Sequence, residues 1–278
     1  MTRVSAPETW LTLYCLPHAG GSAQPYAGLA TAVPPGVRVV PLELPGHGRR
    51  LRERPLREMG QVVTEVIRLM GLPGLPESPD LTGLPDPTGE GDGRGRPFAL
   101  FGHSFGALVG YETTRRLRQL GTPPELLLVS ARNSPVWPLS HEPLHALADP
   151  SFTAGVSRMG GIPQALLAQP AVLQVFLPSL RADLRMVETY AHTHREPLDV
   201  PIAAFVGLQD RLTDPAGMAA WAEQTSRPFD LTPVRAGHFF LDEPEFRTAL
   251  AARLARLAPP AGEGEGDDCA GRPVAAGR

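Results

Sequence analysis

The chain has 278 residues, 42% of them hydrophobic and 20% charged, and its formal net charge is −3. This length and apolar content suffice for one large core, and the charge balance excludes the basic surface that nucleic-acid binding requires. The amino-terminal residues form no apolar signal-peptide core, and no segment approaches the ~20 apolar residues of a membrane span, so we expect a cytoplasmic protein.

The first predicted strand, Trp10–Leu16, leads into a loop with two consecutive glycines, Pro17–Ser22, and a helix is expected over Ala23–Ala32. Glycines allow the backbone of such a loop to come close to a bound molecule. The loop is similar to the HGGG-type element of esterases, in which backbone amides stabilise a developing negative charge on oxygen. We expect the amide of Ala19 to be one donor of such an oxyanion hole.

Strands and helices alternate along the next part of the chain. A strand is predicted at Val37–Leu42, a helix at Arg57–Met70 and a further strand at Glu125–Ser130. This alternation favours an α/β fold, with a mainly parallel sheet that is covered by helices on both faces.

The stretch Gly102–Gly106 has the G-x-S-x-G pattern. It lies between a predicted short buried strand, Pro97–Phe101, and a helix predicted over Ala107–Leu120. Strand, sharp turn and helix together are typical of a nucleophile elbow, which holds its serine exposed at the helix amino terminus. We therefore interpret Ser104 as a nucleophile and the amide of Phe105 as the second oxyanion donor.

About seventy residues then follow without a predicted strand. Helical patterns occur at His141–Leu147, Ser151–Met159, Gln164–Leu167, Ala171–Phe176 and Leu177–Tyr190. Long insertions at the catalytic edge of a sheet are usually functional, so we interpret residues 133–195 as a helical lid over Ser104. Met159, Leu180 and Met186 are candidates to line its chamber, although apolar residues at helical spacing also serve plain packing.

Two acidic residues compete for the role of the catalytic acid. Asp210 comes just after a predicted central strand, Pro201–Gly207, at the edge where catalytic groups gather in open α/β sheets. Asp214 precedes Pro215 and has the pattern of a helix N-cap. We therefore prefer Asp210.

His238 is the predicted catalytic base, because it follows the acid in sequence and comes after a predicted strand at Phe229–Val234. His103 lies inside the elbow and is interpreted as structural. His141 and His145 are four residues apart on a predicted helix, which is a metal-ligand spacing. No third ligand stands nearby, so we expect packing there and no metal.

The chain is expected to form one folded domain over residues 1–257. A segment at about residues 71–96 is rich in Gly, Pro and Asp and is interpreted as a flexible insertion, and residues 258–278 as a disordered tail. Of the two cysteines, Cys15 lies in a predicted buried strand and Cys269 in the polar tail. A disulfide between them is not expected.

Five blocks, in this order, resemble the type II thioesterases: Leu16–Ala23, Leu44–Gly46, Gly102–Gly106, Leu180–Asp183 and Gly237–Phe240. The resemblance runs from about Trp10 to Leu257. It departs from the family at Phe105, where methionine or leucine is usual, and at Pro45–Arg49, where Pro-Gly-His-Gly-Arg replaces Pro-Gly-Arg.

The resemblance implies the α/β-hydrolase fold and a triad of Ser104, Asp210 and His238. It further implies hydrolysis of acyl thioesters on the phosphopantetheine arm of an acyl or peptidyl carrier protein, without a cofactor. The implied task is the editing of stalled or misprimed units in polyketide or non-ribosomal peptide biosynthesis. Residue spacing alone indicates a serine hydrolase. Two alternatives therefore remain: a general carboxylesterase or peptidase of the same fold, and a non-hydrolytic carrier-binding module.

Overall fold

The computed structural model describes residues 8–72, 96–162, 164–193 and 196–260. Most of the insertion predicted at 71–96 and of the tail predicted at 258–278 lies outside these ranges. The strands are β1 (Leu11–Leu16), β2 (Val37–Pro41), β3 (Phe98–His103), β4 (Leu126–Ser130), β5 (Ile202–Gly207) and β6 (Phe229–Val234). The helices are α1 (Gln24–Ala27), α2 (Met59–Met70), α3 (Phe105–Gln119), α4 (Asp149–Arg158), α5 (Gln164–Leu167), α6 (Pro170–Glu188), α7 (Pro215–Ala219) and α8 (Pro244–Ala255).

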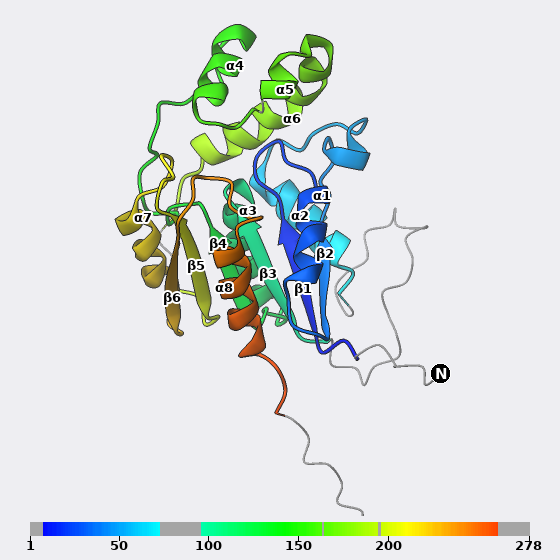
Figure 1. Ribbon diagram of the computed structural model, residues 1–278, viewed down its shortest axis with the longest axis vertical. Helices are drawn as coiled ribbons and strands as arrows, with labels where there is room; N and C mark the ends of the chain where they lie inside the picture. The colour runs from blue at the N-terminus through cyan, green and yellow to red at the C-terminus, as the bar shows by residue number, and fades with distance from the viewer. Residues whose placement is uncertain (1–7, 73–95, 163, 194–195, 261–278) are drawn as a thin grey trace, which may run out of the picture.

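The six strands form one sheet in the order β2-β1-β3-β4-β5-β6, and each neighbouring pair is parallel. The central strands are mainly apolar and buried along their whole length, as expected of a sheet that is covered on both faces. Because all strands run the same way, the loops after β1, β3, β4, β5 and β6 converge on one edge of the sheet (Figure 1).

Alternate residues of each strand point to opposite faces of the sheet, and a separate apolar core forms on each face. One core joins Tyr14 and Leu100 to α2 and α3. The other joins Leu13 and Phe101 to α1 and α8. The predicted mainly parallel sheet with helices on both faces is thus confirmed.

Helices α4, α5 and α6 stand together beyond the carboxyl ends of the strands (Figure 1). They enclose a small core of their own, formed by Leu144, Phe152, Val156, Ile162, Leu173, Leu177, Leu180 and Leu184. The Arg181 guanidinium on α6 lies over the Phe152 ring and bonds to the Asp149 carboxylate, so α4 is attached to α6 by polar as well as apolar contacts.

Four predicted helices differ from those observed. Residues 23–32 form only the short α1 and a 3-10 turn, Gly28–Thr31, and Gly28, a residue of low helix propensity, lies where the two meet. The two helices predicted at Ala171–Phe176 and Leu177–Tyr190 are one continuous helix, α6, which contains Pro178. The helix predicted at His141–Leu147 is wrong, because that segment is irregular.

Burial explains the continuity of α6. The helix buries Leu173, Leu177, Leu180 and Leu184 at helical spacing, and this packing outweighs the hydrogen bond that a proline removes. None of the helices in the described residues is both long and apolar enough to cross a membrane.

Candidate active site

Ser104 occupies the turn between β3 and α3, with a backbone conformation of φ 55° and ψ −114°. Positive φ is strained for a residue with a Cβ, and only Ser104 and Ala131 adopt it among the described non-glycine residues. The turn is held by the Ser104 amide, which donates to the Ser130 carbonyl on β4 at 2.8 Å.

The glycines on either side of Ser104 are required by close backbone approach. A Cβ on Gly102 would collide with the Gly106 carbonyl oxygen, and a Cβ on Gly106 would collide with that of Leu16 at the end of β1. The predicted strand, sharp turn and helix are confirmed, and the serine lies at the helix amino terminus, where the positive end of the helix dipole favours an anion.

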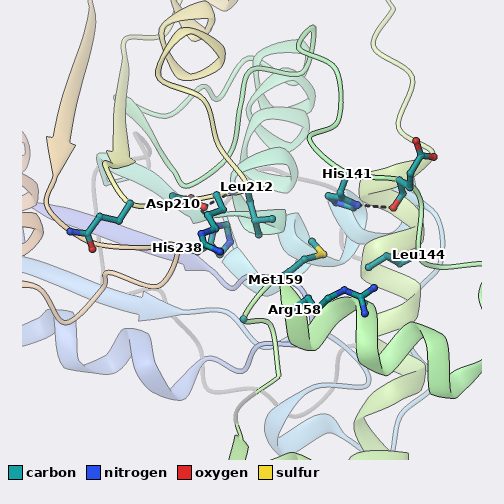
Figure 2. Close-up of a pocket in the computed structure, with 12 residues that line it drawn as sticks. His141, Leu144, Arg158, Met159, Asp210, Leu212 and His238 are labelled. Atoms are coloured by element: carbon teal, nitrogen blue, oxygen red, sulfur yellow. Dashed lines mark hydrogen bonds and ion pairs between the residues drawn. The ribbon is translucent and has the colours of Figure 1, made fainter.

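Asp210 and His238 follow the neighbouring strands β5 and β6, and their side chains meet. The Asp210 Oδ2 atom lies 2.8 Å from Nδ1 of His238 (Figure 2). Because a carboxylate only accepts, Nδ1 carries the proton and the Nε2 atom of His238 is left as an acceptor. That tautomer is the one a general base needs.

The Asp210 carboxylate is fully buried and accepts two further hydrogen bonds, from the Leu212 amide at 2.8 Å and the Thr213 hydroxyl at 2.9 Å. Burial alone would raise its pKa. The hydrogen bond to His238, the charge of that histidine and the two other donors outweigh burial and lower the pKa. The acid therefore stays ionised at neutral pH.

Asp214 caps α7 instead. Its carboxylate accepts from the amide of Ala216 at 2.7 Å and from that of Gly217 at 3.4 Å, which confirms the predicted N-cap.

Ser104 and His238 line one narrow cavity of about 50 Å³, together with Ala19 and with Leu184 and Val187 of α6. His238 and Met159 also line a larger adjoining pocket of about 560 Å³, which Figure 2 shows between the α4 end and the loop that carries Asp210. His238 thus lines both spaces, whereas Ser104 lines only the narrow cavity and Asp210 only the wider pocket.

Two aromatic rings lie against the His238 ring. Its ring centroid lies 4.9 Å from that of Phe239 and 5.4 Å from that of His103. His103 is fully buried and Nδ1 lies 2.8 Å from the Ser130 hydroxyl, which agrees with the structural role predicted for it. Burial holds the pKa of His103 well below its usual value and lowers that of His18, in the glycine loop, to about 4. Both are neutral at neutral pH.

His141 and His145 lie on an irregular segment rather than on a helix, and both approach Glu188 at the end of α6. The Glu188 carboxylate accepts from the amides of Leu144 and His145, and Nδ1 of His145 lies 2.6 Å away. These histidines therefore anchor the segment to α6. No group of three or more candidate metal ligands occurs among the described residues.

Of the three candidates to line the chamber, Met159 lies at both cavities. Leu180 and Met186 are buried in apolar clusters, the first in that of α4–α6 and the second against the sheet. The prediction did not include Leu184 and Val187, which share the face of α6 above Ser104. Their helical spacing was visible in the sequence, but not which side of α6 faces the cavity.

Comparison with known proteins gives consistent matches. The thioesterase domain family model matches residues 11–78 and 91–257. The gramicidin S biosynthesis protein GrsT of Aneurinibacillus migulanus is 32% identical over 85% of this chain and 85% of its own. Among solved structures, the thioesterase RedJ from the prodiginine pathway of Streptomyces coelicolor is 33% identical, with a TM-score of 0.71 over 92% of this chain and 90% of RedJ. The type II thioesterase BorB from the borrelidin biosynthetic cluster is 32% identical, with a TM-score of 0.71 over 90% of this chain and 94% of BorB.

Proposed function

Because this chain belongs to the thioesterase domain family and has the α/β-hydrolase fold, we propose that Ser104, His238 and Asp210 are the catalytic triad of a thioester hydrolase. The observation that carries the proposal is the bond from His238 to the Asp210 carboxylate beside the cavity that Ser104 lines. Their order along the chain, serine then acid then histidine, is the order of the α/β-hydrolases.

In the first half-reaction, Nε2 of His238 takes the hydroxyl proton of Ser104 while Oγ attacks the thioester carbonyl carbon. The amides of Ala19 and Phe105 donate to the oxygen as its charge develops. The tetrahedral intermediate then expels the thiolate, which receives the proton from His238. The products of this half are a free thiol and an acyl group on Ser104.

In the second half-reaction, water takes the place of the thiol. His238 removes a proton from the water, whose oxygen attacks the acyl carbon, and the same amides stabilise the second oxyanion. Breakage of the bond to Oγ, with return of the proton to Ser104, releases the carboxylic acid. Asp210 remains ionised throughout and stabilises the positive charge that His238 acquires.

The proposed substrate is an acyl group on the phosphopantetheine arm of an acyl or peptidyl carrier protein. The proposed task is the removal of stalled or misprimed units in polyketide or non-ribosomal peptide biosynthesis. Support comes from the relatives. GrsT is a gramicidin S biosynthesis protein, and BorB is the type II thioesterase from the borrelidin biosynthetic cluster.

We propose that helices α4–α6 form the lid of this site. Met159 after α4, and Leu184 and Val187 on α6, line the cavity with Ser104, so an acyl chain on the serine would lie against these apolar side chains. The pocket of about 560 Å³ is the proposed approach for the pantetheine arm.

The test compares hydrolysis of a short acyl group presented on a phosphopantetheinylated carrier protein and as a p-nitrophenyl ester, for the parent enzyme and for Ser104→Ala. We expect the carrier thioester to give the higher kcat/KM and the Ser104→Ala variant to hydrolyse neither. Turnover of the ester alone would identify a general esterase. Failure to hydrolyse both, with no labelling of Ser104 by a fluorophosphonate, would identify a binding module.

A further inference from the structure

Helix α6 is bonded to the glycine loop through one carboxylate. Oδ2 of Asp183 on α6 accepts from the Gly20 amide at 2.8 Å, and lies 2.8 Å from Nε2 of His47 in the loop after β2. Asp183 is 2% exposed and His47 is 4% exposed. The Asp183 carboxylate therefore has His47 and the Gly20 amide as partners in place of water. A buried carboxylate is retained only where such partners compensate its lost hydration.

The partners of His47 determine its protonation. Nδ1 lies 3.0 Å from the Pro45 carbonyl oxygen, which can only accept, and Nε2 faces the Asp183 carboxylate. A neutral imidazole has one donor, whereas a carbonyl oxygen and a carboxylate facing its two nitrogens require two. Burial lowers the pKa of His47, but the hydrogen bond and charge of Asp183 outweigh burial and raise it. We therefore describe the pair as an imidazolium and a carboxylate.

The amides of the glycine loop have separate partners. The His18 amide donates to the Tyr26 hydroxyl at 3.2 Å, the Gly20 amide to Asp183 and the Gly21 amide to the His18 carbonyl at 2.9 Å. The Ala19 amide, within the described part of the chain, has no acceptor. Ala19 also lines the cavity of Ser104, which suits the oxyanion role proposed for its amide.

Two more contacts seat α6 on these loops. A Cβ on Gly20 would lie 3.0 Å from Leu180, so the loop packs directly against the helix. The Ser179 hydroxyl donates to the Gly46 carbonyl at 2.5 Å. Ser179 and Asp183 are four residues apart and so lie on one face of α6, which makes this face the contact between the proposed lid and the glycine loop.

We propose that Asp183, held in place by His47, is a positioning residue that fixes the glycine loop so that the Ala19 amide points at the oxyanion. The oxyanion hole is then complete only while α6 is seated, which links the proposed lid to the chemistry of Ser104. This inference rests on the proposed hydrolase function.

The test measures affinity for an oxyanion directly. A trifluoromethyl ketone analogue of the acyl group is attacked by the Ser104 Oγ atom; the carbonyl oxygen becomes an oxyanion, and the serine proton passes to His238. A thioether with a methylene in place of the carbonyl reports ground-state binding only. For Asp183→Asn we expect kcat/KM to fall roughly 10- to 100-fold and the Ki of the ketone to rise by the same factor. The Kd of the thioether should change by less than about 2-fold, because it makes no oxyanion contact.

Asp230→Asn is the matched control. It removes a carboxylate that lies 2.7 Å from Arg253 at the amino-terminal end of β6, away from the catalytic edge. This substitution should change neither kcat/KM nor the Ki of the ketone. All rates are expressed per site titrated to completion with a fluorophosphonate, which excludes unfolded protein. If Asp183→Asn yields no titratable protein, His47→Gln takes its place, because it removes the partner that holds the Asp183 carboxylate, and kcat/KM and the Ki of the ketone should again change in parallel.

The proposal is overturned if Asp183→Asn lowers kcat/KM without a parallel rise in the Ki of the ketone, or if it changes neither kcat/KM nor this Ki. The same variants are assayed with a p-nitrophenyl ester. If the parent enzyme hydrolyses the ester but not the carrier thioester, the proposed substrate is wrong while the positioning role is still measured. If it hydrolyses neither, the proposed function itself fails.

Discussion

Asp210 and Asp214 lie four residues apart, yet their carboxylates serve different partners. Asp210 accepts from His238 at 2.8 Å in a fully buried position, whereas Asp214 accepts from the first amides of α7. The difference follows from the position of each residue. Asp210 lies in the turn directly after β5, whereas Asp214 precedes the proline that begins α7.

Substitution of these two acids should separate their roles. Asp210→Asn is expected to lower kcat by about 10⁴-fold, because an amide in this position favours the wrong tautomer of His238. Asp214→Asn should have little effect, as asparagine caps a helix as well as aspartate does. Steady-state kcat per titrated site measures both effects. A larger loss of kcat in Asp214→Asn than in Asp210→Asn would identify Asp214 as the catalytic acid.

The strained backbone of Ser104 predicts a gain in stability when its side chain is removed. With φ at 55°, glycine is the only residue that adopts this conformation without strain. Ser104→Gly should therefore be more stable than Ser104→Ala by about 1 kcal/mol, while neither variant hydrolyses substrate. Chemical denaturation of the two variants measures the difference, and equal stabilities would show that the turn is not strained.

Gly106 and Gly60 provide a matched pair of helix glycines near the starts of α3 and α2. A Cβ at Gly106 would collide with the Leu16 carbonyl, whereas a Cβ at Gly60 would meet open space. We expect Gly106→Ala to lower both Tm and activity, since β1 and α3 must separate. Gly60→Ala should raise the free energy of unfolding by up to about 1 kcal/mol. A tolerated alanine at Gly106 would contradict the close approach of β1 and α3.

Much of this arrangement could be predicted from sequence because it depends on local pattern. The strand and helix on either side of Ser104, and the positions of Asp210 and His238 after strands, follow from apolar runs that end at turn residues. The continuity of α6 through Pro178 could not be predicted, because it depends on packing against α4 and the glycine loop. Local propensity yields to such packing.

The partners of Asp183 were out of reach for a related reason. Asp183 lies 163 residues after Gly20 and 136 residues after His47 in the sequence, yet its carboxylate contacts both. The resemblance identified both Leu180–Asp183 and the segment around His47 as notable without indicating that they touch. Only the fold brings an insertion helix back onto loops that follow the first two strands.

Met159 is the position at which we expect acyl specificity to respond to substitution, because it lines both the cavity of Ser104 and the wider pocket. Met159→Trp should reduce kcat/KM for longer acyl chains relative to acetyl, with a shift in preference on the order of 1–3 kcal/mol, or 10- to 200-fold. Labelling of Ser104 by a small fluorophosphonate should be unchanged. Met186, which is buried against the sheet, is not expected to act this way. An unaltered acyl profile would place the acyl chain elsewhere.

The buried pair of His47 and Asp183 predicts a pH dependence of stability. The groups around His47 are Asp183 on α6, Glu43 after β2 and His18 in the glycine loop; the two carboxylates raise its pKa in the folded protein. A raised pKa contributes stability that is complete below the unfolded value of about 6.5 and is lost as pH rises through the folded value. The Tm gap between the parent enzyme and His47→Gln should therefore be largest near about pH 6 and narrow at higher pH. In an Asp183→Asn background the burial of His47, which lowers its pKa, is opposed only by the Pro45 carbonyl and the charge of Glu43, so the gap should no longer narrow as pH rises. A gap that widens with pH in the parent background would mean that His47 is neutral in the folded protein.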